Sequence, residues 1–85
     1  MKRSDVTYGQ LDNVLCSLGF TCFVTDDPPP TRVYRHKQTG AMIMLPAYPE
    51  SDRVLEIHML AVRAELDNFG IADPTTFAAK LQKAG

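Results

Sequence analysis

Residues 31–46, TRVYRHKQTGAMIMLP, constrain the fold more than any other part of this chain. They predict two short strands, the first centred on Val33 and Tyr34 and the second formed by residues 42–45. The turn between them is KQTG at 37–40, whose glycine can take the positive φ that a strand reversal needs. This hairpin is also where the sequence hints at chemistry, because it carries cationic and titratable side chains: Arg32, Arg35, His36 and Lys37.

Side chains alternate along a strand, so the first strand of the hairpin has two chemically different faces. The two sets are Thr31, Val33 and Arg35 on one face, and Arg32, Tyr34 and His36 on the other. Tyr34 is the larger apolar residue, but two cationic or titratable neighbours flank it. The pattern therefore leaves open which face meets solvent.

A helix and a strand are expected before the hairpin. A capping box formed by Thr7 and Gln10 predicts a helix over about residues 8–18, and Gly19 is suited to end it. Aromatic and β-branched residues predict a strand over 20–25. The prolines that follow must end this strand, because proline has no N–H to donate to a sheet.

Two helices are expected after the hairpin. Apolar residues at helical spacing predict one from about Ile57 to Phe69, and Asp73 followed by Pro74 opens a third, short helix. The chain thus predicts a single α+β domain over 1–85, in the order helix, three strands, helix and short helix. The sheet should be a three-stranded antiparallel meander with the helices on one of its faces.

Composition is typical of a soluble globular protein, with 45% hydrophobic and 22% charged residues. The sequence has no apolar run long enough for a transmembrane helix, and its first ten residues lack the apolar core of a signal peptide, so a cytoplasmic location is expected. The formal net charge of −1 argues against strong non-specific binding of nucleic acid, although a local basic patch remains compatible with it.

The layout and several motifs resemble the HicA-type toxin family, also called YcfA-like. The motifs are LCSLGF at 15–20, VYRHKQTG at 33–40 with MIMLP at 42–46, and HMLAVR at 58–63 with LDNFGI at 66–71. In order, they cover most of the chain. The resemblance implies a bacterial protein with a fold like the double-stranded-RNA-binding domain. It also implies a metal-independent ribonuclease without a cofactor, neutralised by a HicB-type antitoxin.

The chain departs from the family at the active site, where the family has a glycine-serine-histidine step three residues before the aromatic of the central strand. Here Pro29, Pro30 and Thr31 occupy those positions. Threonine has no group that titrates near neutral pH, and loss of a general acid–base group typically costs about two to four orders of magnitude in rate. No catalytic residue is therefore expected, with His36 as the fallback.

His36 is a weak substitute, because it lies about 16 Å along the strand from Thr31 and no orienting partner is evident. It could act on RNA with Arg35 or Arg32 near the phosphate, or it could simply cap the turn. The candidate RNA-binding residues are Arg32, Tyr34, Arg35, His36 and Lys37. The alternative for these cations is a solubilising strand edge.

Other chemistry-bearing residues are interpreted as structural. His58 should pack against the sheet from the start of its helix, although it could bind an anion there. Cys16 and Cys22 fit no metal motif and are expected to be small buried residues. Core filling is also preferred to an adaptable binding surface for Met42, Met44 and Met59.

Three hypotheses of function remain. The first is a HicA-like domain without ribonuclease activity that binds RNA or a protein partner through its sheet face. The second is an active mRNA-cleaving toxin that uses His36 and is paired with a HicB-like antitoxin. The third is a structural module that forms a homodimer through a strand edge or the exposed sheet face.

Overall fold

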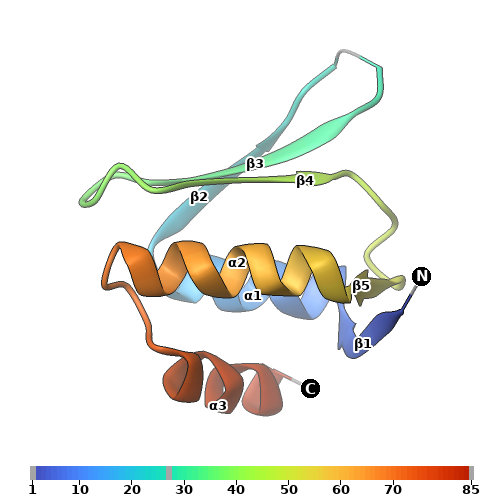
Figure 1. Ribbon diagram of the computed structural model, residues 1–85. Helices are drawn as coiled ribbons and strands as arrows, with labels where there is room; N and C mark the ends of the chain where they lie inside the picture. The colour runs from blue at the N-terminus through green and yellow to red at the C-terminus, as the bar shows by residue number, and fades with distance from the viewer. Residues whose placement is uncertain (1, 27, 85) are drawn as a thin grey trace.

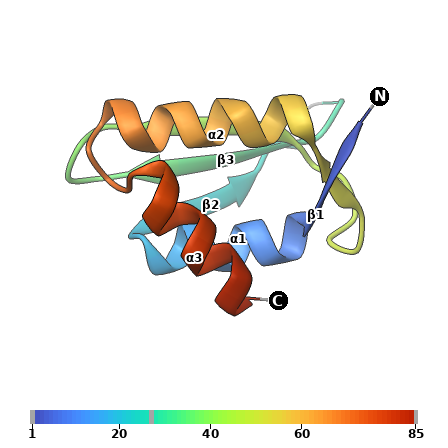
Figure 2. The ribbon, with the colours of Figure 1, turned by 60° about the horizontal axis from the view of Figure 1, so that its bottom comes forward.

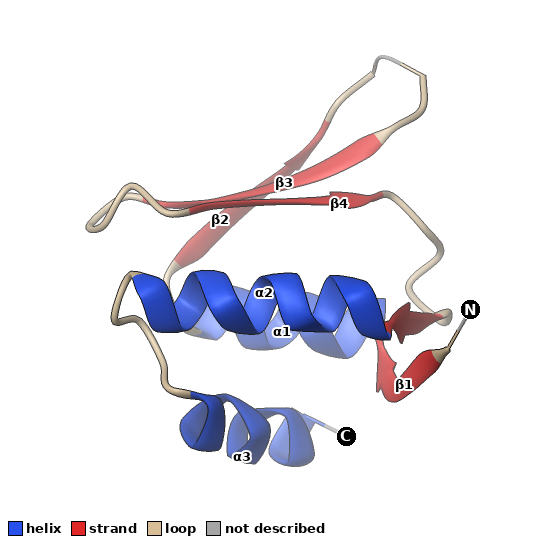
Figure 3. Ribbon diagram, viewed as in Figure 1, coloured by secondary structure: helices blue, strands red, loops and turns tan. Residues whose placement is uncertain are grey.

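The computed structural model describes residues 2–26 and 28–84 (Figure 1). Its elements are, in order, β1 (Arg3–Thr7), α1 (Tyr8–Ser17), β2 (Phe20–Val24), β3 (Thr31–His36), β4 (Met42–Pro46), β5 (Arg53–Leu55), α2 (Glu56–Asn68) and α3 (Pro74–Ala84). Figure 3 shows three layers: the β2-β3-β4 sheet, the layer of α1 and α2, and α3. The predicted α+β class and three-stranded antiparallel sheet are confirmed.

Local interactions set both ends of α1 as the sequence predicts. The Thr7 hydroxyl accepts a hydrogen bond from Gln10 N at 3.2 Å, and the Gln10 side chain accepts one from Thr7 N at 2.8 Å. Beyond the other end, Gly19 adopts a φ of 99°, and a Cβ built there would lie 3.2 Å from Nε2 of His36. Glycine fits this junction because both the backbone conformation and the imidazole disfavour a side chain.

The β3–β4 hairpin has the predicted turn. Gly40 N donates to the His36 carbonyl at 2.8 Å, and His36 N donates to the Ala41 carbonyl at 2.9 Å. Tyr34 pairs with Cys22 of β2 on one side and with Ile43 of β4 on the other. β3 is therefore the central strand of this main sheet, and β2 and β4 are its edges.

A second sheet pairs β1 with β5, and the sequence analysis did not predict it. Arg3 pairs with Leu55 and Thr7 with Arg53. β1 has no apolar alternation, since Val6 is its one apolar residue, so its strand conformation depends on a partner far along the chain. The observed order is β-α-β-β-β-β-α-α, which corrects the expected helix, three strands, helix and short helix.

Helices α1 and α2 cover one face of the main sheet, as predicted (Figure 1). α3 instead packs on the far side of that helical layer, where Figure 2 shows it crossing α1. Asp73 caps α3 by accepting a hydrogen bond from Thr76 N at 2.7 Å. The core lies between these layers, and its most deeply buried large side chains are Tyr8, Leu11, Leu15, Tyr34, Leu66 and Phe77.

Candidate interaction face on the main sheet

The main sheet turns Arg32, Tyr34 and His36 toward the helices, which decides the orientation that the sequence left open. Tyr34 is 1% exposed, and its hydroxyl donates a hydrogen bond to Asp12 of α1 at 2.8 Å. Because neighbouring side chains of a strand alternate, Thr31, Val33 and Arg35 point to the opposite side.

The side of the main sheet away from the helices, here called the outer face, carries residues of all three strands. The register assigns to it Thr21, Phe23, Thr31, Val33, Arg35, Met42, Met44 and Pro46. Phe23, Val33 and Met44 form one row across the sheet. Phe23 is 50% and Met44 63% exposed, whereas Val33 between them is 6% exposed. An apolar row thus crosses the outer face and meets solvent at both ends.

The exposure of Met42 and Met44 corrects the expectation that these methionines fill the core. Met59 is buried, but Met42 is 45% and Met44 63% exposed. β4 turns Ile43 and Leu45 inward, so strand alternation sends both methionines to the outer face. A flexible, polarisable side chain in this position suits an adaptable contact surface.

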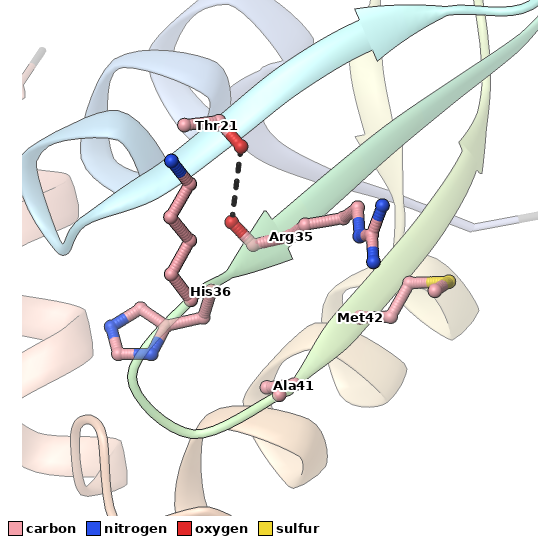
Figure 4. A pocket seen from close by; sticks show the side chains of 7 residues that line it. Thr21, Arg35, His36, Ala41 and Met42 are labelled. Atoms are coloured by element: carbon pink, nitrogen blue, oxygen red, sulfur yellow. Dashed lines mark hydrogen bonds between the residues drawn. The ribbon is translucent and has the colours of Figure 1, made fainter.

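Of the strand residues that the register assigns to the outer face, Arg35 is the one charged residue, and none is a carboxylate. Beside Arg35 lies a hollow of about 360 Å³, lined by Thr21, Arg35, His36, Lys37, Gly40, Ala41 and Met42 (Figure 4). The Thr21 hydroxyl donates to the main-chain carbonyl of Arg35 at 3.4 Å, so it does not engage the guanidinium. Figure 4 shows the side chains of Arg35 and Met42 extending toward the same side of the sheet.

The structure does not bring together the five residues predicted to bind RNA. Arg35 and Lys37 are exposed, whereas Tyr34 and His36 are buried and Arg32 faces α1. Among the predicted cations, Arg35 and Lys37 are therefore the two that can reach a ligand on the outer face.

Arg32 and Tyr34 both contact Asp12 on the inner side of the sheet. The Arg32 guanidinium lies 3.8 Å from the Asp12 oxygen that accepts the tyrosine hydroxyl, the one side-chain ion pair seen in residues 2–26 and 28–84. Burial raises the pKa of Tyr34 well above its usual range, and the hydrogen bond to Asp12 adds to the rise. These groups tie β3 to α1.

His36 has neither ring nitrogen free. Nε2 lies 3.1 Å from the Leu18 carbonyl and donates to it, because a carbonyl oxygen only accepts, and Nδ1 shares a hydrogen bond of 2.9 Å with the Thr39 hydroxyl. The Thr39 hydroxyl in turn accepts from Ala41 N at 3.2 Å. The imidazole ring also packs against the Phe20 ring, with the two ring centroids 5.0 Å apart. His36 therefore acts as a brace between the turn and the end of α1, and it offers no free nitrogen for proton transfer.

Thr31, which the resemblance aligns with the histidine of the HicA-type family, is bound to the preceding backbone. Its hydroxyl donates to the Pro29 carbonyl at 3.3 Å, and its N–H donates to the Thr25 hydroxyl at 3.1 Å. These contacts hold the start of β3 and provide no acid–base group near neutral pH.

His58 lies in a cluster with two tyrosines at the start of α2. The Tyr8 hydroxyl accepts a hydrogen bond from Leu55 N at 3.3 Å and shares another with Nδ1 of His58 at 2.9 Å. The ring centroid of Tyr48 lies 6.4 Å from that of His58. Sequence reasoning expected His58 to pack against the sheet, but its partners come from α1 and from the loop after β4.

The stability of the protein should therefore decrease in mild acid through His58. Burial, followed by the nearby Arg3, lowers the pKa of His58 from its usual value of 6.5. The unfolded chain then binds a proton at His58 more readily than the folded chain does. The stabilisation of the folded state by neutral His58 is therefore fully present above pH 6.5, and it is lost as the pH falls toward the lower pKa of His58 in the folded state. Urea unfolding at about pH 7.5 and about pH 5.5 should show this loss, and His58→Gln should reduce it. An unchanged pH dependence in His58→Gln would contradict this assignment.

The cysteines do not form a reactive or metal-binding site. Cys16 is exposed and Cys22 half-buried, which corrects the expectation that both are buried. Burial is the main cause that raises the pKa of both thiols, so neither is activated as a thiolate. Across residues 2–26 and 28–84, no three His, Cys, Asp or Glu side chains gather as a metal site would require.

Comparisons of the chain with protein-family models, with curated proteins and with solved structures find no match. None of the helices that the structure describes is long and apolar enough to cross a membrane. What the fold and the site define is a small α+β protein with an apolar, weakly cationic sheet face.

Proposed function

We propose that this chain is a HicA-like domain without ribonuclease activity, and that it binds a protein partner through the outer face of its main sheet. The observation that carries the proposal is the composition of that face. Phe23, Met42 and Met44 are exposed there beside a single arginine, and none of the residues that the register assigns to this face is a carboxylate.

The order of elements supports the HicA-like part of the proposal. α1, β2, β3, β4 and α2 follow the α-β-β-β-α order of the double-stranded-RNA-binding-domain fold that the resemblance implies. The motif LCSLGF spans the junction from α1 to β2, and MIMLP is β4. On this interpretation β1, β5 and α3 are additions to the family fold.

The absence of an available acid–base group supports the loss of ribonuclease activity. Thr31 replaces the family histidine, and both nitrogens of His36 are engaged by Leu18 and Thr39. RNA cleavage by a metal-independent ribonuclease needs a group that can take and return a proton.

The charge of the outer face favours a protein partner over RNA. Binding to a nucleic-acid backbone depends on several cations placed along it, and this face offers Arg35 with Lys37 at the adjoining turn. Aromatic and methionine side chains are enriched in protein interfaces, where a few buried anchors supply most of the affinity. Phe23 and Met44 are placed to act as such anchors, and a HicB-like antitoxin is the partner that the resemblance suggests.

Two glutamate variants test the outer face against a matched position elsewhere. The tagged protein, Phe23→Glu and Phe69→Glu are used to capture proteins from a lysate of the source organism. Phe23 is 50% exposed on the outer face, and Phe69 is 42% exposed at the end of α2, so both changes insert a charge at a similar exposure. A partner that Phe69→Glu retains and Phe23→Glu loses is the expected result.

RNA assays with the same three proteins distinguish the alternatives. Labelled RNA should remain intact, and any RNA complex should be weak at about 0.15 M salt. A salt-sensitive RNA complex that Phe23→Glu abolishes would replace the protein partner with RNA. Cleavage that is lost in His36→Ala would establish the active toxin instead, and a set of captured proteins that ignores Phe23 would overturn the proposal.

A further inference from the structure

A hollow of about 240 Å³ runs along the open edge of β4. Four consecutive residues of β4 line it, Met42 to Leu45, together with Ala61 and Glu65 of α2. Met42 and Met44 point to one side of the sheet, and Ile43 and Leu45 to the other. A hollow on one face of a sheet would meet only every second side chain of a strand. A hollow lined by side chains of both faces must therefore lie along the edge of that strand. β3 occupies the other edge, so this hollow follows the open one, with α2 beside it (Figure 1).

The backbone of β4 presents unpaired groups to this hollow. Hydrogen-bonded pairs of β3 and β4 include His36 with Ala41, and Ala47 N donates to the Pro30 carbonyl at 3.1 Å. In an antiparallel ladder such pairs alternate, so Ile43 and Leu45 also bond to β3. The N–H and C=O groups of Met42 and Met44 are therefore directed to the open edge.

An extended segment of a partner fits this edge, whereas a second copy of the chain does not. A strand added to β4 would lie about 4.8 Å from it and would pass over α2. Since α2 lies along β4, pairing β4 with β4 of a second copy would place the two α2 helices about 4.8 Å apart as well. Packed helices need about 8–10 Å between their axes, so the two copies would collide. The space is thus suited to one strand that carries no helix of its own beside it.

The residues around the hollow set the chemistry of that segment. Ala61 leaves room for apolar side chains that point toward α2, and Met42 and Met44 offer apolar contact to those that point the other way. Glu65 is the one charged residue of the lining, and it takes no part in the ion pair that the described residues contain. A lysine or arginine in the segment would complement its carboxylate.

We propose that β4 and α2 together form a peptide-binding groove. An extended, apolar segment with one basic residue adds to the main sheet there as a fourth strand, bonded through Met42 and Met44. This is the recognition mode in which main-chain hydrogen bonds supply affinity and alternate side chains supply specificity. The proposal rests on the proposed function, since it specifies how a protein partner is held, and a strand in this groove also extends the outer face.

The experiment uses a phage-displayed library of random ten-residue peptides, selected on the full chain. Selected peptides are synthesised with a fluorophore, and their Kd is measured by fluorescence polarisation. We expect apolar sequences with a lysine or arginine. Ala61→Arg fills the groove and should weaken binding about tenfold or more, whereas Ala64→Arg should change the Kd by less than about twofold. Both alanines are exposed on α2, and arginine is nearly as good a helix former as alanine, so the two variants form a matched pair.

Amide hydrogen exchange provides a second measurement on the unmodified chain. Without peptide, the amides of Met42 and Met44 should exchange faster than those of Ile43 and Leu45, which bond to β3. Bound peptide should slow the exchange of Met42 and Met44. Exchange at these two amides that bound peptide leaves unchanged would overturn strand addition.

The remaining outcomes separate the groove from the outer face as a whole. Failure to select any peptide that depends on Ala61 overturns the groove. Peptides that lose binding in Phe23→Glu but not in Ala61→Arg would lie on the outer face, which rejects the groove and keeps the proposed function. If light scattering detects a dimer and the Met44 amide exchanges slowly without peptide, the β4 edge is occupied by a second copy of the chain, which rejects the peptide groove. Peptide binding in the groove, with lysate capture that ignores Phe23, would reject only the proposed function.

Discussion

Replacement of Phe77 by alanine should lower the free energy of unfolding by about 3–5 kcal/mol, the usual cost of removing a large aromatic side chain from a packed core. Phe77 is 1% exposed and belongs to the same buried cluster as Leu66 of α2 and Leu11 of α1. It is the one fully buried large side chain that α3 contributes in the described part of the chain. Since domains are stable by about 5–15 kcal/mol, this loss is a large part of the total. Urea unfolding followed by circular dichroism measures it.

Phe69→Ala is the control for this prediction. Phe69 is 42% exposed beyond the end of α2, so its truncation should cost less than about 1 kcal/mol. Equal losses in the two variants would show that α3 is not held by Phe77. Weaker protection of α3 amides in Phe77→Ala would show that the loss begins with the release of this helix.

Asp12→Ala should destabilise the protein by about 2–3 kcal/mol, because a hydrogen-bond donor and a cation lose the same acceptor. The Tyr34 hydroxyl, in a side chain that is 1% exposed, would have no acceptor at 2.8 Å. The Arg32 guanidinium, 3.8 Å from the same oxygen, would lose its carboxylate, and its Nε already lacks a partner among the described residues. The ion pair is long and partly exposed, so most of the cost should come from the tyrosine.

A double-mutant cycle separates these two contributions. In a Tyr34→Phe background the hydroxyl is absent, so Asp12→Ala should cost clearly less than in the natural sequence. Asp12→Asn retains an acceptor for Tyr34 and should also cost less than alanine. Identical costs in both backgrounds would mean that Asp12 does not act through the tyrosine hydroxyl.

Features encoded by neighbouring residues were predicted correctly from the sequence. The capping box of Thr7 and Gln10, the left-handed Gly19 and the Asp73 cap each depend on side chains within a few positions of one another. The same holds for the turn at 37–40, where Gly40 adopts the expected positive φ. In each case the hydrogen bond or backbone conformation that decides the structure is local.

Features that depend on distant partners were missed or left open. β1 pairs with β5 although Arg3 to Thr7 show no strand pattern, because the pairing is supplied by residues far along the chain. The brace that His36 makes with Leu18 and Thr39 could be suspected from its position near the turn, but its burial could not. The groove beside β4 has no sequence signal, since it requires α2 to lie along that edge.

For function, the sequence by itself determined that the hairpin lacks a histidine at position 31, and that Met42 and Met44 share one face of a strand. Only the tertiary structure decided which face is which. Strand alternation separates Arg32, Tyr34 and His36 from Thr31, Val33 and Arg35 without saying which set is buried. The buried set is the one that contacts α1 and its C-terminal end. Asp12 of α1 accepts a hydrogen bond from the Tyr34 hydroxyl, and the carbonyl of Leu18, just after α1, accepts one from His36. The helices cover three of the five residues predicted to bind RNA, and they leave Arg35, an apolar face and an open strand edge to solvent.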